Sequence, residues 1–357
     1  MPISTEKPVL VTGGTGYLAG GIIKDLLDAG VTVHTTVRDL GKKEKYEALV
    51  KAGKESPGTI KFFQADLVKP GSFAEAIEGC SIVFHTASPF PEKIRDSQKE
   101  LIDPAVGGTR NVLNQVTKSG SVKRVVLTSS SLALHTDAKD VTTSTTGVLN
   151  EECWNETASL SYQPYAYSKV MAEKAAWEFA EGQDVWDLVV INPGLIMGPC
   201  RIGMQLSAQS VGIMKAFGDG SFSNGAPRLA MCVGDIREIS KAHIEAAFRP
   251  EAKGRYLVCK HETDFFEMTQ IVAKKYGADY MLPKSAVPKA ILWAFGPYID
   301  ERMNRKFVSR NVGLKFKTDT SKSERELGIQ YRPLETTLNE MFQQLVDNGV
   351  LQKKNGS

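Results

Sequence analysis

The sequence predicts an α/β protein, in which a Rossmann-type doubly wound parallel sheet is joined to a smaller, mixed C-terminal region. Three observations predict this class. Short β-branched runs alternate with helical patterns up to about Asn192, a glycine-rich turn follows the first expected strand, and the alternation ends beyond Pro193-Gly194. Strands that alternate with helices at this spacing form βαβ units, and helices cover both faces of the resulting parallel sheet.

The first half holds six apolar runs of strand length with helical patterns between them. We expect the strands to span Val9–Thr12, Val31–Val37, Ile60–Gln64, Ile82–Thr86, Val122–Thr128 and Leu188–Asn192. The main helices are expected at Ile22–Ala29, Phe73–Glu78, Leu101–Ser119 and Tyr165–Glu181.

The second half is less regular, because Pro-Gly and Gly-Pro pairs and a turn-rich loop at 218–227 interrupt the pattern. The polar, Thr-rich segment Thr136–Leu160 is either a mobile flap or a surface excursion. Beyond residue 193 we expect helices at Ile236–Phe248, Phe266–Tyr276, Pro288–Phe295 and Glu335–Asn348, and a strand at Arg255–Cys259.

Composition excludes several partners. The net charge is +3, from 44 basic and 41 acidic residues without long runs of one sign, so neither nucleic acid nor a membrane is expected as a partner. Five scattered cysteines without a CxxC pair or zinc spacing predict no metal site and suit a reducing compartment. The N-terminus lacks the apolar core of a signal peptide, and we expect a cytoplasmic protein, a monomer or a homodimer.

The first expected strand runs into a small-residue turn, Thr12–Ala19, that carries both GxGxxA and GxxGxxA spacings. Such a turn lets the backbone approach a pyrophosphate, which sits against the free N–H groups of the helix N-terminus. Residues 1–192 are therefore predicted to form mainly a dinucleotide-binding domain. Residues 193–357 are predicted to form mainly a substrate-binding region, from which the segment around 229–248 is a candidate to return to the first domain.

The end of the second strand indicates which dinucleotide binds. NAD sites usually carry Asp or Glu there, whereas this chain has Arg38, and a guanidinium matches the oxygens of a 2′-phosphate. The Gly41–Lys45 segment is either a solvated helix start or added charge for that phosphate. Asp39, next to Arg38, is an acidic residue that complicates this choice of cofactor. The complication disappears if Asp39 pairs with a nearby lysine. The sequence therefore predicts NADP(H).

A candidate proton donor lies at the start of a long amphipathic helix. Tyr165 and Lys169 are one turn apart on the same helix face, so the ammonium can stabilise the tyrosinate and draw its pKa toward neutrality. The same spacing recurs at Tyr256/Lys260, in an expected strand, and at Tyr280/Lys284, which Pro283 interrupts. Tyr167 is expected to be structural.

A second element of the site is the polar run Thr128–Ser131, just past the end of an apolar strand. A run of serines at such a place usually forms a turn and has no catalytic role. Ligands of open α/β sheets nevertheless bind at these strand ends, and beside a nucleotide turn and a Tyr/Lys pair the run is predicted to be catalytic.

These motifs together resemble the extended short-chain dehydrogenases/reductases, specifically the branch of dihydroflavonol-4-reductase-like and yeast aldehyde (methylglyoxal) reductases. The resemblance runs from about Lys7 to Leu351. It rests on Val11–Ala19, Val37–Asp39, Ala65–Leu67, Val83–Pro89, Val106–Leu113, Leu127–Ser130, Tyr165/Lys169, Asn192–Pro199, Val233–Glu238 and Asp319–Gly328.

The resemblance implies NADPH-dependent reduction of a small aldehyde or ketone, with Tyr165 as general acid, Ser130 as hydrogen-bond donor to the carbonyl and Lys169 on the nicotinamide ribose. Asn111 resembles a helix asparagine with a supporting role. The implied cofactor-binding residues are Gly13, Thr15, Gly16, Tyr17, Leu18, Arg38, Lys45, Asp66, Leu67, Thr86, Ala87, Ser88, Tyr165, Lys169, Pro193, Gly194, Ile196 and Ser207. The implied substrate contacts are Ser88, Ser130, His135 and Tyr165.

Two departures bear on the substrate. Flavonoid reductases usually carry Asn or Asp where this chain has His135, which argues against a flavonoid, and the signature that cinnamoyl-CoA reductases carry around the tyrosine is missing. Two other functions stay open: a nucleotide-sugar epimerase or dehydratase with tightly bound NAD, and a non-catalytic NADP(H)-sensing protein. Arg38 argues against the first, and the retained Tyr165 and Lys169 argue against the second.

Overall fold

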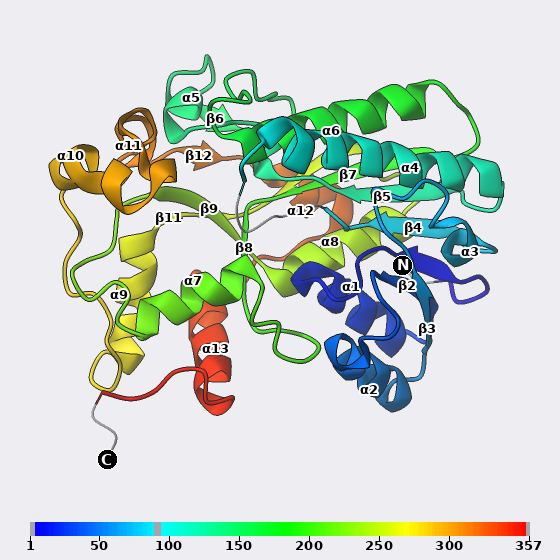
Figure 1. Ribbon diagram of the computed structural model, residues 1–357, viewed down its shortest axis with the longest axis horizontal. Coiled ribbons are helices and arrows are strands. Elements are labelled where there is room, and N and C mark those ends of the chain that lie inside the picture. The colour runs from blue at the N-terminus through cyan, green and yellow to red at the C-terminus, as the bar shows by residue number, and fades with distance from the viewer. Residues whose placement is uncertain (1–3, 89–93, 355–357) are drawn as a thin grey trace.

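The central feature is a seven-stranded parallel sheet in the order β10-β7-β5-β4-β1-β2-β3 (Figure 1). The structure, a computed structural model, describes residues 4–88 and 94–354, so Pro89 of the fourth motif lies outside the described residues. The predicted fold class is confirmed. The strands are β1 (Val9–Val11), β2 (Thr32–Val37), β3 (Thr59–Gln64), β4 (Ile82–His85), β5 (Arg124–Thr128), β7 (Asp187–Pro193) and β10 (Gly254–Val258).

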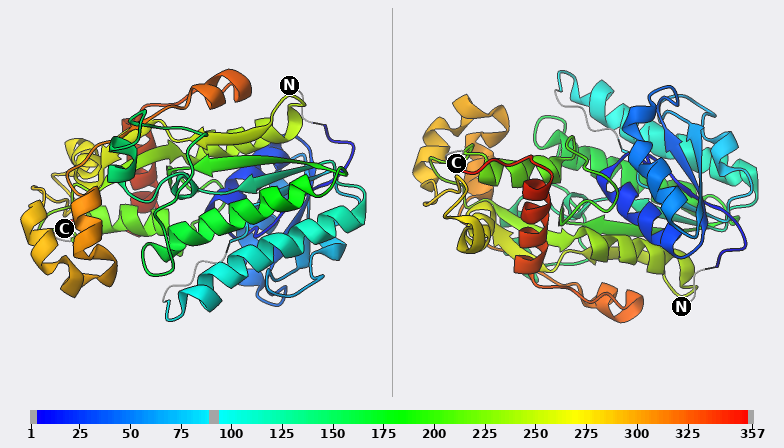
Figure 2. Two further views of the ribbon diagram at one scale, coloured as in Figure 1. Left: turned by 90° about the horizontal axis from the view of Figure 1, so that it is seen from above. Right: turned by 90° about the horizontal axis from the view of Figure 1, so that it is seen from below.

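Helices cover both faces of this sheet because its strands alternate between two apolar clusters. Val9 and Val11 of β1 point into one cluster and Leu10 into the other. In Figure 2 the helices lie in two layers on either side of the strands. One layer holds α1 (Tyr17–Asp28), α2 (Glu47–Glu55) and α8 (Ile236–Phe248), and the other holds α3 (Ala74–Ile77), α4 (Asp103–Ser119) and α6 (Pro164–Glu181).

The strand order reverses between β1 and β4, which pair with each other. The chain leaves β1 toward β2 and β3 on one side and returns through β4 toward β5, β7 and β10 on the other. Ligands of open α/β sheets bind beyond the carboxyl ends of the strands at such a reversal. The expected site residues should therefore gather at this edge.

A smaller region follows β7 and holds a three-stranded sheet in the order β11-β9-β8. Two segments return from it to the large sheet: α8 packs on α1, and β10 forms the edge strand beside β7. The strands here are β8 (Leu195–Met197), β9 (Ala230–Asp235), β11 (His261–Asp264) and β12 (Lys317–Thr318). The helices are α7 (Gln209–Gly218), α9 (Phe265–Tyr276), α10 (Lys289–Ile299), α11 (Arg305–Asn311), α12 (Ser321–Leu327) and α13 (Leu334–Asp347).

The Thr-rich segment 136–160 is folded onto the smaller region. It holds α5 (Ala138–Thr142) and β6 (Val148–Leu149), and β6 pairs with β12. The buried Asp137 carboxylate accepts hydrogen bonds from Tyr162 and Asn311 and pairs with Arg310. Three 3₁₀ turns and one π turn complete the elements: η1 (Lys43–Lys45), η2 (Gln98–Ile102), η3 (Ser131–Ala133) and η4 (Glu301–Met303).

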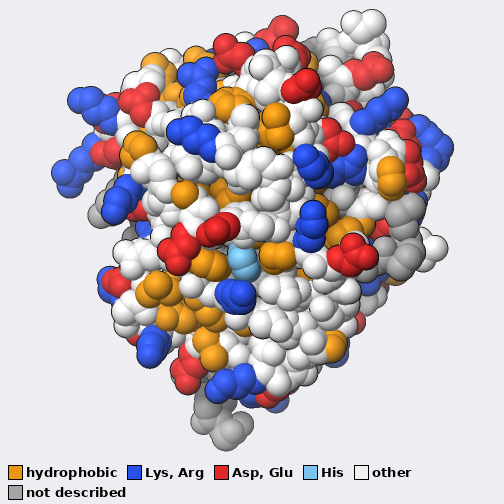
Figure 3. Space-filling view, turned by 90° about the vertical axis from the view of Figure 1, so that its right-hand side faces the viewer, with side chains coloured by type: hydrophobic (Ala, Val, Ile, Leu, Met, Phe, Trp, Pro, Cys, Tyr) orange, Lys and Arg blue, Asp and Glu red, His pale blue; other side chains and the backbone are white. Residues whose placement is uncertain are grey.

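Charges of both signs are mixed over the face shown in Figure 3, as the near balance of the sequence predicts. Across residues 4–88 and 94–354, no helix is long and apolar enough to cross a bilayer. The same residues hold no cluster of three or more His, Cys, Asp or Glu side chains that could bind a metal ion.

Candidate active site

The glycine turn lies directly on β2. The backbone N–H of Gly13 donates to Thr36 Oγ1 at 2.9 Å, and that of Gly14 donates to the Thr36 carbonyl at 3.0 Å. A Cβ on Gly14 would lie 2.2 Å from Thr35 Oγ1, so only glycine fits there. Helix α1 follows at once, and its N-cap residue, Gly16, provides no side-chain cap. The N–H groups of its first turn are thus available to an anion.

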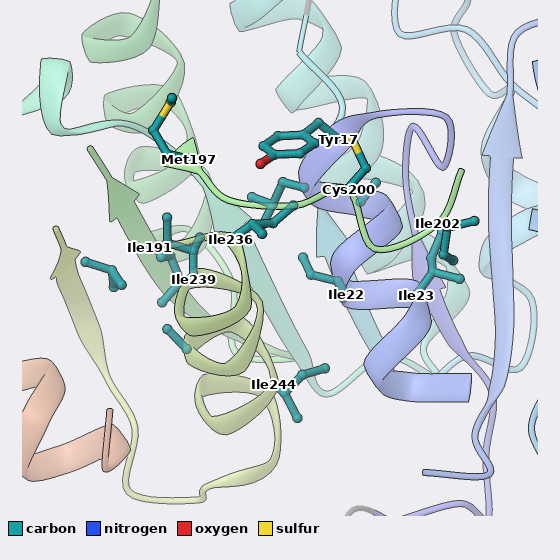
Figure 4. Packing of buried hydrophobic residues seen from close by; sticks show 14 of the residues in the cluster. Tyr17, Ile22, Ile23, Ile191, Met197, Cys200, Ile202, Ile236, Ile239 and Ile244 are labelled. Carbon is teal, nitrogen blue, oxygen red and sulfur yellow. The ribbon is translucent and has the colours of Figure 1, made fainter. Parts of the chain in front are cut away.

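Tyr17 and Leu18, both predicted to bind cofactor, turn their side chains into the core. The Tyr17 hydroxyl donates to the carbonyl of Gly198, and burial raises the pKa of this phenol well above its ordinary value. Figure 4 shows the Tyr17 ring in one cluster with Met197 and Cys200. Only the backbone of these two residues can therefore meet a phosphate, whereas Thr15 and Gly16 are exposed at the turn.

The basic residues after β2 face solvent. Arg38 is exposed and makes no ion pair within the described residues, and Lys45 is exposed in η1. Asp39 pairs with Lys42 at 3.7 Å and accepts from the N–H of Gly41 at 2.8 Å. The acidic residue that complicated the choice of cofactor is thus engaged with its own loop, and the Arg38 guanidinium stays exposed to solvent.

The loop after β3 carries Asp66 and Leu67, which are expected at the adenine. Asn111 on α4 holds this loop: its Nδ2 donates to the carbonyls of Leu67 at 3.1 Å and Lys69 at 2.9 Å, and its Oδ1 accepts from the N–H of Gly71. The amide of Asn111 is therefore occupied in holding the loop after β3, and its support is structural.

Thr12 fastens β1 to β4 at the strand reversal, a role that the sequence analysis missed. Its hydroxyl oxygen accepts from the N–H groups of Thr86 and Ala87, each at 3.1 Å, and donates its own proton to Nδ1 of His85 at 3.0 Å. His85 is consequently a neutral acceptor. Burial, reinforced by the charge of Lys169, lowers the pKa of His85 to about 4.

Tyr165 and Lys169 share the first turns of α6. The helix begins after Gln163, whose φ of 55° places it in the left-handed region, and Pro164 occupies the first turn. Lys169 is 8% exposed, and its Nζ lies 5.7 Å from the centroid of the half-buried Tyr165 ring. The same Nζ donates to Ser88 Oγ at 3.1 Å. The fold thus joins this helix to the end of β4.

Ser130 lies past the end of β5 and caps η3, which packs against α6. Its Oγ accepts from the N–H of Leu132 at 3.1 Å, and this bond leaves the hydroxyl hydrogen available for donation to a ligand. Its carbonyl accepts from Nδ2 of Asn192 at 3.1 Å. Both anchors fix the serine at the edge of the sheet where the glycine turn and Ser88 also lie.

The segment after β7 continues along this edge. Pro193 ends β7, and Ile196 lies in β8. A Cβ on Gly194 would meet the Cys232 carbonyl oxygen at 2.3 Å, so this position is closely packed. Ser207 is exposed in the loop before α7, and Gln205 of that loop lies against Gly20 of α1.

His135, the candidate substrate contact, is 8% exposed. Its Nδ1 lies 3.0 Å from the Ser131 carbonyl and donates to it, and its ring lies 5.1 Å from that of Phe316 between centroids. Burial lowers the pKa of His135 below its ordinary value. The imidazole is therefore a neutral packing group in this structure.

A cavity of about 20 Å³ lies between the ends of β4 and β5 and helix α6. It is large enough for a single water molecule. Ser88, Ser129, Lys169 and Glu173 are among the residues that line it. Glu173 was not predicted, although its spacing of four residues from Lys169 places the two on one helix face.

The chain is similar to known proteins both in sequence and in structure. Residues 9–213 match the family model described as the NAD dependent epimerase/dehydratase family. Cinnamoyl-CoA reductase CAD2 of Medicago truncatula is 33% identical over 345 residues, which cover 94% of this chain and 95% of that protein. Anthocyanidin reductase of Arabidopsis thaliana is 36% identical over 282 residues, which cover 76% of this chain and 81% of that protein.

Among solved structures, yeast methylglyoxal/isovaleraldehyde reductase Gre2 complexed with NADPH is similar to this chain with a TM-score of 0.75 and 28% identity, over 96% of this chain and 99% of that one. Vestitone reductase of alfalfa gives a TM-score of 0.72 with 27% identity, over 97% of this chain and all of its own. The chain therefore belongs to the NAD dependent epimerase/dehydratase family, within the extended short-chain dehydrogenases/reductases, and its relatives named above are oxidoreductases.

Proposed function

We propose that this protein is an NADPH-dependent reductase that converts a small aldehyde or ketone to the alcohol, with Tyr165 as general acid. One observation carries the proposal: the buried ammonium of Lys169 lies beside the Tyr165 ring at the carboxyl edge of the sheet. Reductase relatives that match nearly the whole chain support the reaction class.

The cofactor site fits a phosphorylated dinucleotide. The exposed turn at Thr15 and Gly16 and the free N–H groups at the start of α1 suit a pyrophosphate, and the exposed Arg38 and Lys45 suit a 2′-phosphate. Asp66 and Leu67 would border the adenine. When bound, NADPH supplies the hydride.

The protein's own side chains bind the carbonyl oxygen and transfer a proton to it. The Ser130 hydroxyl, anchored by Leu132, donates to the carbonyl oxygen and polarises the bond. As the carbonyl carbon accepts hydride, its oxygen takes the proton of the Tyr165 hydroxyl, and the product is the neutral alcohol. The adjacent Lys169 ammonium stabilises the tyrosinate that this transfer leaves, and solvent then restores its proton.

A small carbonyl substrate is proposed on two grounds. The position that would carry Asn or Asp for a flavonoid holds His135, and this ring is buried against Phe316 instead of facing a ligand. The match to the yeast methylglyoxal/isovaleraldehyde reductase covers 96% of the chain. NADPH consumption over small aldehydes, α-ketoesters, diketones and flavanonols would rank the classes.

Tyr165→Phe tests the assignment. Removal of a general acid costs about 10²–10⁴-fold in rate, so turnover with a generic aldehyde should fall by at least about 100-fold. NADPH affinity, measured by fluorescence titration, should stay near wild type. Tyr167→Phe, two residues further along α6, is the matched control and should keep its activity. Equal turnover of Tyr165→Phe and wild type would refute the role of Tyr165.

A further inference from the structure

We propose that Glu173 and Arg255 are positioning residues: their buried ion pair fixes the catalytic serine segment against the helix that carries Tyr165 and Lys169. The proposal rests on the reductase function above for its kinetic consequence. Arg255 Nε lies 2.6 Å from Glu173 Oε1, and the two side chains are 8% and 0% exposed.

Glu173 is the meeting point of four donors. Its Oε2 accepts from Ser129 Oγ at 2.5 Å and from Asn192 Nδ2 at 2.8 Å. Its Oε1 accepts from Arg255 Nε and, at 3.3 Å, from Trp177 Nε1. Because all four partners donate, both carboxylate oxygens of Glu173 act as acceptors.

These bonds reach the proposed catalytic groups from two sides. Ser129 is the residue before Ser130, and the Asn192 amide that binds Glu173 also donates to the Ser130 carbonyl. On α6, Glu173 follows Lys169 by one turn, and both line the same small cavity. A single carboxylate therefore couples the position of the serine hydroxyl to that of the ammonium.

Arg255 adds a third contact. Its Nη1 donates to the carbonyls of Glu151 at 3.0 Å and Cys153 at 2.6 Å, and its guanidinium lies 3.9 Å from the centroid of the Trp154 ring. The next residue, Asn155, donates to the carbonyl of Leu132 at 2.6 Å, within the turn that Ser130 caps. The ion pair thus supports the serine turn both from α6 and from the 151–155 segment.

Stability alone does not account for this arrangement. A buried ion pair is often no more stable than apolar side chains of similar volume, because both charges lose their hydration. Here the Nη2 of Arg255 is buried and has no hydrogen-bond partner among the described residues. An imperfectly satisfied charge that touches both halves of the site is better explained by positioning.

The test is the double variant Glu173→Met with Arg255→Met, which removes both charges and keeps side-chain bulk. Because Ser129, Asn192 and Trp177 lose their shared acceptor, we expect a folded protein with a lower Tm, a kcat at least 10-fold lower and a KM for NADPH within about 3-fold. Loss of kcat at constant KM, in a variant that is fully folded at the assay temperature, would not follow from a purely structural role. An unchanged kcat would overturn the proposal.

The control is a second Arg–carboxylate pair, which joins β5 to β7 in the same sheet. Arg124 at the first residue of β5 binds Asp187 at the first residue of β7, with an Nη2–Oδ2 distance of 2.6 Å, at the opposite end from the site. Arg124→Met with Asp187→Met should leave kcat unchanged. An equal loss of kcat in both double variants would assign the effect to general loosening and overturn the proposal.

Two further measurements keep the outcomes separate. If the double Met variant does not fold, Glu173→Gln is used instead: its NH₂ would face donors, so kcat should fall at least 10-fold. Amide exchange at Leu132 gives a readout without turnover, and it should quicken at least 10-fold in the pair variant and not in the control. An inactive wild type would refute the proposed function alone, whereas unchanged Leu132 exchange would refute the positioning role.

Discussion

At the scale of single residues, the choice of cofactor depends on which charges are already engaged. Asp39 is held by Lys42 and by the N–H of Gly41, whereas Arg38 points to solvent without an ion pair in the described part of the chain. A guanidinium that keeps its charge at every physiological pH is well suited to a phosphate that binds at this strand end.

Arg38→Ala should therefore discriminate between the two nicotinamide cofactors. A hydrogen bond to a charged group contributes about 1.5–3 kcal/mol, so the KM for NADPH should rise roughly 10- to 100-fold. The KM for NADH should change little, because NADH has no 2′-phosphate. Lys51→Ala, an exposed lysine on α2, controls for general loss of positive charge. Equal rises for both cofactors would contradict the 2′-phosphate assignment.

At the scale of elements, buried neutral histidines brace the strand ends. His85 at the end of β4 accepts from Thr12, and His243 on α8 accepts at Nε2 from Thr128, at 2.8 Å, at the end of β5. The Nδ1 of His243 donates to the Ile239 carbonyl at 2.7 Å. Burial lowers the pKa of His243 to about 4, as it does that of His85.

These histidines should make folding sensitive to acid. A pKa depressed from 6.5 to about 4 means that the unfolded chain binds more protons between these values. The stabilisation is complete above pH 6.5 and is lost as the pH falls toward 4. Each such group contributes about 1.4 kcal/mol per pH unit to the slope. Urea unfolding between pH 6 and 5 measures how the free energy of unfolding depends on pH. For His243→Gln this slope should be lower than for wild type by about this amount. An unchanged slope would contradict the burial of a neutral His243.

Elements that the sequence predicted well are those with a strong local pattern. Each β-branched run became a strand of the large sheet, and Ile236–Phe248 forms α8 with the predicted bounds. Strands β8 and β9 and helix α7 were not predicted. Their form depends on contacts with distant segments, such as the pairing of β9 with β11, which carry no local signature.

The candidate site likewise contains residues that local patterns predicted and residues that only distant contacts bring in. The glycine turn, the Thr128–Ser131 run and the Tyr165/Lys169 pair were predicted from spacing and position, and the family resemblance singled out Ser130 within the run; the structure gathers them at one sheet edge. Glu173 had a usable signal in its spacing from Lys169. Arg255 had none, because its partner lies 82 positions away and the two meet only when β10 docks beside β7.

At the scale of the whole molecule, two regions share one chain without a simple boundary. The central sheet draws its edge strand β10 and its covering helix α8 from beyond residue 193. Arg255 of that edge strand donates hydrogen bonds to the carbonyls of Glu151 and Cys153, which belong to the segment before α6. The predicted division at residue 192 stays a prediction, but the site clearly depends on segments from both halves.

The central claim is that the Tyr165 hydroxyl, with Lys169 beside it, faces the nicotinamide of bound NADPH. A crystal structure with NADP⁺ tests this most directly. The account predicts the Tyr165 hydroxyl and Ser130 Oγ on the same side of nicotinamide C4, both within reach of one carbonyl oxygen, and Lys169 Nζ bound to the ribose. A Tyr165 hydroxyl directed away from the ring, or a nicotinamide at another edge of the sheet, would contradict it.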